Sequence, residues 1–254
     1  MTMLIFISPA KTLDFESDLK IGSSQEPYFL EDAAKVNRTL KKKSRKALRE
    51  LQGISTQLAE LNYHRNQSWS IDHEEHTRQA MLAFKGDVYQ GLNADEWTPE
   101  DVDFAHEHLR ILSGLYGILK PTDLIKPYRL EMGTALKVGR RGNLYLFWAD
   151  KLRGYFKDHV EKETLIINLA SNEYFKALNT AKVPNQVHDI TFKDLSKGDH
   201  KVVSFFAKKA RGLMANFIIQ NRINKLNDLK AFTEEGYYFD EVQSTEKHYV
   251  FLRD

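Results

Sequence analysis

A serine and a lysine stand three residues apart in Ser8-Pro9-Ala10-Lys11, directly after the apolar run Met3–Ile7. This spacing matches the S-x-x-K pattern of serine acyl-enzymes, in which the lysine helps to activate the serine. However, a proline inside the pattern opposes the usual helical turn, and no K-T-G segment follows. We therefore favour an anion site, in which Lys11 and the hydroxyls of Ser8 and Thr12 hold a phosphate or carboxylate. A solvated lysine is the simpler alternative.

A second group of positive charges, Lys208, Lys209 and Arg211, follows the apolar pair Phe205-Phe206. We expect this group at the start of a helix, where its charge opposes the positive end of the helix dipole. A bound anion would offset both, so the group predicts a phosphate-binding surface. The alternative is that the side chains extend into water, since a charge at an exposed helix end costs only about 0.3–1 kcal/mol.

The densest basic run is Lys41–Lys46, with five positive charges in six residues. On a helix such a run is usually a solvated face, and the alternative is a diffuse contact with nucleic acid.

Two glycines and a proline interrupt the apolar segment Leu112–Pro121. The order of Leu112, Gly114 and Gly117 resembles the turn of helix-hairpin-helix elements, whose backbone N–H groups approach a DNA phosphate closely. The glycines of that turn are normally two residues apart; here they are three apart, with Lys120 after them. A turn between helices that serves packing alone is an equal alternative.

Histidines occur in two pairs, His73 with His76 and His106 with His108. Neither pair matches H-E-x-x-H, and the chain has no cysteine to complete a zinc site. We interpret both pairs as polar surface and expect no metal or other cofactor.

Composition limits the classes of protein. The 254 residues include 37 Lys+Arg and 35 Asp+Glu, so a net charge of +2 does not by itself indicate a polyanion partner. The absence of cysteine excludes disulfides and is typical of a reducing compartment. The apolar run near the N-terminus is too short for a signal peptide, and no segment is long enough to span a bilayer, so we expect a cytoplasmic protein without a membrane partner.

The elements predicted from hydrophobic spacing and turn signals make a single α+β domain over residues 1–254, with a central sheet and surrounding helices. The predicted strands are Met3–Ile7, Thr164–Ala170, Val187–Phe192, Lys201–Phe206, Tyr237–Phe239 and His248–Leu252. The predicted helices are Glu31–Leu61 with a break near Gly53, Thr77–Gln90, a helix begun by Thr98-Pro99, Leu144–Val160, Asn172–Leu178 and Ala207–Ile223.

Several longer blocks together resemble the signature blocks of the bacterial YaaA family. They are Leu4–Asp14, Phe84–Tyr89, Leu112–Gly117, Lys126–Gly133, Asn168–Ser171 with Glu173–Lys176, and Ala207–Met214. The resemblance implies a peroxide-stress protein that lowers free intracellular iron and binds DNA through a basic cleft and a helix-hairpin-helix element. It also implies an unusual mixed α/β fold and no settled enzymatic activity.

We therefore expect a protein that binds double-stranded or structured DNA largely without sequence preference. The predicted contacts are Lys11, Gly114, Gly117, Lys120, Lys208, Lys209 and Arg211, and affinity should fall steeply with salt.

The main alternative is an enzyme that acts on a nucleotide or another phosphorylated small molecule. Its predicted pocket consists of Ser8, Lys11, Asp87, Tyr128, Arg129, Glu131, Asn168 and Ser171, with Lys11 and Arg129 holding the anion and Glu131 or Asp87 as acid or base. If Asp87 and Glu131 face Lys11 across a closed pocket, the enzyme is favoured; an open basic groove favours DNA. An iron-sequestering protein is a third alternative, for which the sequence shows no complete set of ligands.

Overall fold

The computed structural model describes residues 2–17, 19–71 and 76–254. Its strands of the main sheet are β1 (Met3–Ile7), β5 (Leu109–Ser113), β6 (Gly117–Leu119), β8 (Leu165–Asn168), β9 (Val187–Ser196), β10 (Asp199–Lys201), β11 (Tyr238–Phe239) and β12 (His248–Arg253). Among the described residues they form one eight-stranded sheet in the order β11-β12-β9-β8-β1-β5-β6, with β10 beside β9.

The middle of this sheet is parallel: β12, β9, β8, β1 and β5 all run in one direction. The edge pairs β11–β12 and β5–β6 are antiparallel, as is the hairpin β9–β10. Every residue of β1 is buried, which is expected of a strand covered on both faces. Because β1 lies between β5 and β8, its carboxyl end is flanked by the carboxyl ends of two other strands.

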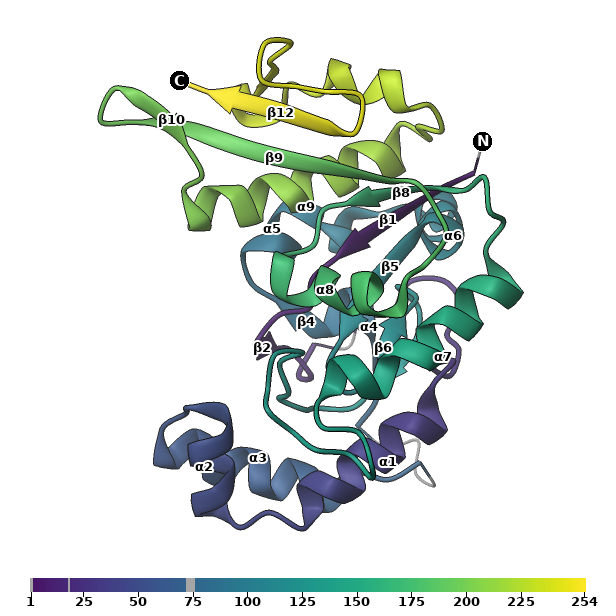
Figure 1. Cartoon of the computed structure of the whole chain (residues 1–254), viewed down its shortest axis with the longest axis vertical. Helices are drawn as coiled ribbons and strands as arrows, with labels where there is room; N and C mark the ends of the chain where they lie inside the picture. Colours follow the sequence, from purple (N-terminus) through teal and green to yellow (C-terminus); the bar gives the residue numbers. More distant parts are fainter. Residues whose placement is uncertain (1, 18, 72–75) are drawn as a thin grey trace.

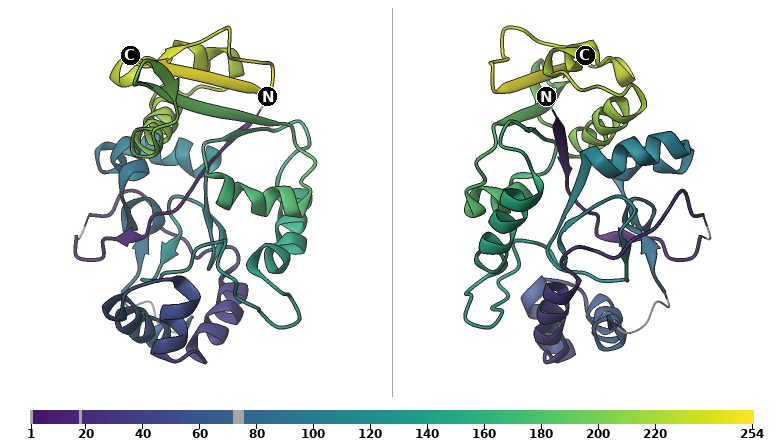
Figure 2. Two further views of the ribbon diagram at one scale, coloured as in Figure 1. Left: turned by 60° about the vertical axis from the view of Figure 1, so that its left-hand side comes forward. Right: turned by 90° about the vertical axis from the view of Figure 1, so that its right-hand side faces the viewer.

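Helices cover both faces of the sheet. On one face lie α7 (Leu144–His159) and α8 (Asn172–Ala181); on the other lie α5 (Asp87–Leu92), α6 (Pro99–His108) and α9 (Ser204–Gln220) (Figure 2). At the far end of the long axis from β9 and β12 are α1 (Leu30–Lys41), α2 (Arg45–Gln52) and α3 (Thr56–Ser68) (Figure 1). Three short 3-10 helices span Ala94–Glu96, Leu226–Ala231 and Glu234–Gly236.

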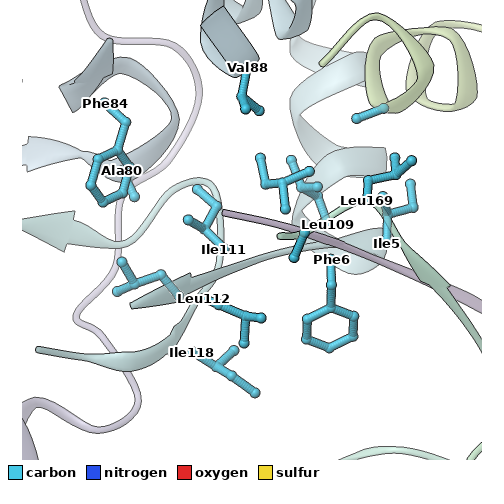
Figure 3. Packing of buried hydrophobic residues seen from close by; sticks show 14 of the residues in the cluster. Ile5, Phe6, Ala80, Phe84, Val88, Leu109, Ile111, Leu112, Ile118 and Leu169 are labelled. Atoms are coloured by element: carbon cyan, nitrogen blue, oxygen red, sulfur yellow. The ribbon is translucent and has the colours of Figure 1, made fainter. Parts of the chain in front are cut away.

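The core lies between the central strands and these helices. Ile5, Phe6, Leu109 and Ile111 come from β1 and β5 and are fully buried (Figure 3). One cluster of buried apolar residues extends from the strands to Ala33, Val36, Leu40 and Leu48 at the α1–α3 end. The prediction of a mixed α/β fold with a central sheet and flanking helices is confirmed.

The single helix predicted for Thr77–Gln90 is wrong. The segment contains β3 (Arg78–Gln79), α4 (Ala80–Ala83), β4 (Phe84–Lys85) and then α5. Its backbone pairs with other segments instead, β3 with β7 (Leu124–Ile125) and β4 with β2 (Thr12–Leu13). Gly86, with φ +138°, then separates β4 from α5.

The strand predicted for Lys201–Phe206 is also wrong in extent. The hairpin with β9 exists, but β10 ends at Lys201 and α9 begins at Ser204. Lys208, Lys209 and Arg211 therefore lie beyond the first turn of α9, where a charge interacts less with the helix dipole than we had predicted.

The helix-hairpin-helix element predicted at Gly114–Gly117 is not there. This turn joins two antiparallel strands, β5 and β6, and its residues are buried. A Cβ on Gly114 would lie 2.4 Å from the Leu130 carbonyl oxygen, and one on Gly117 (φ +72°) would lie 2.7 Å from the Trp148 ring. Both glycines serve close packing and backbone conformation, and neither backbone is open to a phosphate.

Candidate functional site

The carboxyl ends of β1 and β8 bring together three predicted site residues. Phe6 pairs with Asn168 in parallel register, so Ser8 and Ser171, which follow the two strands, lie side by side. The Ser171 N–H donates to Ser8 Oγ at 2.9 Å, and the two hydroxyl oxygens are 3.4 Å apart. Ligands of open α/β sheets bind outside the carboxyl ends of strands, where neighbouring connections diverge.

Lys11 does not contact Ser8 but pairs with Glu131. Its Nζ lies 2.8 Å from Glu131 Oε1, and its side chain is 59% exposed. The pattern S-x-x-K therefore has no activated serine here, which leaves the anion or small-molecule site. A narrow hollow surrounds the pair. Its lining consists of Pro9, Ala10, Lys11, Tyr128, Arg129, Leu130, Glu131 and Tyr174.

Asp87 begins α5, directly after Gly86. A Cβ added to Gly86 would lie 3.6 Å from the Cβ of Ala10, so the start of α5 passes close to the segment that carries Lys11. Asp87 is not among the residues that line the hollow around the Lys11–Glu131 pair. Glu131 is therefore the carboxylate that contacts the lysine, as the enzyme alternative requires of one of its two acids.

Buried phenols form the wall of this site. The Tyr128 hydroxyl and Ser113 Oγ are 2.7 Å apart, and the Tyr89 hydroxyl donates to the Ser8 carbonyl at 3.1 Å. Burial raises the pKa of Tyr89, Tyr128 and Tyr174, so all three stay neutral and able to donate a hydrogen bond at physiological pH. Sequence reasoning missed Ser113, Tyr89 and Tyr174, although each falls inside or beside one of the quoted blocks.

Asn168 has a structural role at this edge. Its Nδ2 donates to Asp189 Oδ1 at 2.7 Å, and its Oδ1 accepts from the Ala170 N–H at 3.0 Å. These bonds stabilise the turn between β8 and α8. They engage both the nitrogen and the oxygen of the Asn168 side-chain amide. Asn168 therefore positions Ser171, the residue before α8, rather than facing a ligand directly.

Arg129 and Arg65 make an excess of positive charge beside the hollow. Among the described residues the buried Arg129 Nε has no hydrogen-bond partner. The Arg129 carbonyl accepts from Gln52 Nε2 at 2.8 Å, which ties α2 to this segment. Burial, and next the charge of Arg129, lower the pKa of Arg65 on α3. Among residues 2–17, 19–71 and 76–254, no carboxylate lies within 4.0 Å of either guanidinium.

The remaining predicted cations are not all near Lys11. Lys208 is exposed, while Lys209 pairs with Glu235. Burial lowers the pKa of Arg211. The backbone of α9 at Lys209 packs against Gly91 of α5.

Lys120 lies elsewhere, because the antiparallel register of β5 and β6 pairs Ile111 with Leu119. This places Lys120 beside Arg110, at the end of the hairpin opposite Gly114 and Gly117.

The histidine pairs show no metal site among the described residues. His73 lies outside them, and His76 is exposed. His106 Nδ1 is 2.8 Å from Thr122 Oγ1, and His108 Nδ1 is 2.8 Å from the Met3 carbonyl oxygen. No group of three or more potential metal ligands occurs in the part of the chain that the structure describes.

No helix among the described residues is long and apolar enough to cross a membrane.

Comparison with known proteins gives one consistent family. A family model described as peroxide stress protein YaaA matches residues 3–243. A UPF0246 protein from Aliivibrio fischeri strain MJ11 is 45% identical over 256 residues, with 99% of this chain and 98% of that protein covered. A UPF0246 protein from Hahella chejuensis is 46% identical over 256 residues, with 99% and 100% covered.

Proposed function

The chain belongs to the peroxide stress protein YaaA family, whose description gives it a role in oxidative stress, and we propose that it acts there by binding DNA. The binding is largely independent of base sequence and uses phosphate contacts at the α1–α3 end of the molecule. Lowering of free intracellular iron, which the family resemblance implies, is part of the same proposal.

The observation that carries this proposal is the helical pair α2–α3. Only Gly53, Ile54 and Ser55 separate the two helices, and Gly53 is exposed in the left-handed conformation, with φ +60°. Ser44 and Ser55 cap the two helices through bonds to the Ala47 and Leu58 N–H groups. The open glycine turn and the free N–H groups at the start of α3 are features of a helix-hairpin-helix phosphate contact.

Positive charge is concentrated on the segment that leads into α2. The basic run Lys41–Lys46 precedes and begins α2, and Lys42, Lys46 and Arg49 are exposed. Arg45 is the member that pairs with an acid, Glu60 on α3. Arg65 on α3 is close enough to Arg129 for that charge to lower its pKa, and Arg129 lines the same hollow as Lys11. These cations can neutralise DNA phosphates, and the proposal assigns them no contact with base edges. Affinity would then come from the phosphates and would not depend on base sequence.

The test is a titration of a fluorescent duplex at several salt concentrations. We expect wild-type affinity to fall linearly in log–log form by a slope of about −0.9 per phosphate contact. Replacing Lys42, Lys46 and Arg49 with Ala should reduce the magnitude of that slope by roughly 2 to 3. Whole-cell measurement of chelatable iron in the same variants tests the part of the proposal on iron.

The matched control replaces Lys157, Lys162 and Lys201 with Ala, which removes three exposed charges on other elements. Equal losses in both triple variants would mean that overall charge alone drives binding. Salt-independent or absent binding by the wild type would contradict the proposal.

A second candidate function is chemistry on a nucleotide or other phosphorylated small molecule at Lys11, whose hollow of about 10 Å³ admits a single functional group while the rest of the molecule lies on the surface. The Lys11–Glu131 pair, with Asp87 beginning α5 next to Ala10, favours it. Incubation with a panel of nucleotides and sugar phosphates, followed by chromatography of products, would detect conversion. We expect Glu131→Gln to reduce it by about 100-fold or more, as for loss of a general acid or base, and Glu161→Gln to leave it unchanged. No conversion of any panel member by the wild type would exclude this candidate for those compounds.

A further inference from the structure

A second, larger cavity lies away from both the hollow and the helical pair. It has a volume of about 440 Å³, which is within the usual range for small-molecule sites. Its lining comes from the segment before α1, the end of α6, the β5–β6 hairpin and α7. Its polar lining includes Tyr28, Arg110, Lys120 and Asp123.

Two cations, Arg110 and Lys120, line this cavity. Arg110 is 6% exposed; its Nε donates to the Tyr155 hydroxyl at 3.0 Å, and its Nη1 donates to two backbone carbonyls. Lys120 Nζ is 2.8 Å from His106 Nε2. Among the described residues, no carboxylate lies within 4.0 Å of Arg110 or Lys120. Burial and the neighbouring Arg110 lower the pKa of Lys120, and burial and Lys120 lower the pKa of His106.

The acids that line the cavity are Glu26, Glu107 and Asp123, and none of them pairs directly with Arg110 or Lys120 among the described residues. Asp123 is buried, and its two oxygens accept from Gln25 Nε2 at 2.6 Å and from the Lys120 N–H at 2.9 Å. Burial raises the pKa of Asp123 to about 6, so its carboxyl takes up a proton as the pH falls below that value. Glu107 is exposed at the rim, as is Glu26. Both Asp123 oxygens are therefore engaged by Gln25 and the Lys120 backbone, and among the described residues Asp123 makes no ion pair within 4.0 Å with the Arg110 or Lys120 side chain.

Aromatic rings from the segment before α1 and from α7 also line the cavity. Tyr28 is 56% exposed, and its ring centroid lies 5.2 Å from Tyr155 and 4.9 Å from His159. Tyr155 and His159 are stacked at 5.1 Å on α7. An exposed aromatic side chain held by other rings offers a surface for a planar group at little cost in conformational entropy.

We propose that this cavity binds a small molecule that joins a phosphate to an aromatic base, that is, a mononucleotide. The phosphate contacts Lys120 and Arg110, and the base packs against Tyr28. The site is separate from the proposed DNA surface, because Lys120 and Arg110 lie at the far end of the β5–β6 hairpin from the segment that carries Arg129. Lys120 is thereby reassigned from a DNA contact to a small-molecule contact.

The experiment is calorimetric titration of the full chain with adenosine monophosphate, inorganic phosphate and adenosine in turn. We expect the wild type to bind the monophosphate more tightly than either part, and Lys120→Met to weaken that binding at least tenfold. Tyr28→Ala should weaken binding of the monophosphate while leaving inorganic phosphate unchanged. Lys157→Met, at an exposed position on α7, is the control.

Amide chemical-shift mapping identifies the site that is occupied. Shifts at residues 107–110 and 118–123 support the proposal, and shifts confined to residues 8–11 and 128–131 overturn it by placing the ligand in the hollow. Absence of binding at millimolar monophosphate also overturns it. If Lys120→Met fails to fold, the Tyr28→Ala comparison and the wild-type map still decide. A duplex that displaces the monophosphate would show that DNA occupies the cavity instead.

Discussion

At the scale of single residues, the glycines have separate physical roles that the sequence alone does not distinguish. Gly53 and Gly117 both have positive φ, but a Cβ on Gly53 meets no atom within 4 Å, while one on Gly117 meets the Trp148 ring at 2.7 Å. Spacing suggested the second turn as the DNA contact, although it is the buried one. Burial against a ring 31 positions away along the chain has no local signal.

This difference predicts unequal costs of substitution. Gly53→Ala should lower the free energy of unfolding by about 1 kcal/mol, from the left-handed backbone alone. Gly117→Ala adds a steric conflict inside the core and should lower it by about 2 to 4 kcal/mol in total. Denaturant unfolding of both variants measures the difference. Equal losses would show that Trp148 moves aside without cost.

A site residue could be predicted from the sequence when its role depends on residues close to it along the chain. Ser8, Ser171 and Glu131 follow strands or occur in polar blocks, and the structure places them around one edge of the sheet. No sequence pattern marked Arg65 as a site residue. Its role depends on the nearby charge of Arg129, which belongs to a segment distant along the chain. Pairings across such distances depend on tertiary packing, which one sequence does not display.

At the scale of elements, strong local signals predicted helices well. Thr98 and Asp101 form a complete capping box before α6, with Pro99 at its first position, and Gly53 ends α2. The prediction failed for residues 77–90. The apolar residues there do recur at helical spacing, but they are apolar because the segment is buried on every side. Residues 80–84 are all buried, and such a run has no period that distinguishes helix from strand.

At the scale of the whole molecule, the buried carboxyl of Asp123 makes stability depend on pH. Its pKa is raised to about 6, above the ordinary 3.8, so the folded chain holds this proton more tightly than the unfolded chain does. Its contribution to the free energy of unfolding therefore increases as the pH falls through 6 toward 3.8. Hydrogen bonds and nearby cations lower the pKa of Asp32 and Asp101, whose contributions are lost below about pH 4.

The corresponding measurement compares wild type with Asp123→Asn by urea unfolding at pH 7.5 and pH 5. The wild type should gain about 1 kcal/mol relative to the variant over this interval. Asp103→Asn, an exposed change on α6, should show no such gain. A difference that is constant with pH would mean that the Asp123 carboxyl titrates normally.

The position of β1 in the middle of the sheet also affects folding during synthesis. Met3–Ile7 pairs with Leu109–Ile111 and with Leu165–Asn168, so more than 100 residues separate it from its nearer partner strand. At about 5–20 residues per second, a ribosome needs roughly 5 to 20 seconds to complete the intervening chain. During that time five consecutive apolar residues have no strand to pair with. The nascent chain therefore offers a binding segment for chaperones, and the high contact order of the sheet delays folding until late in synthesis.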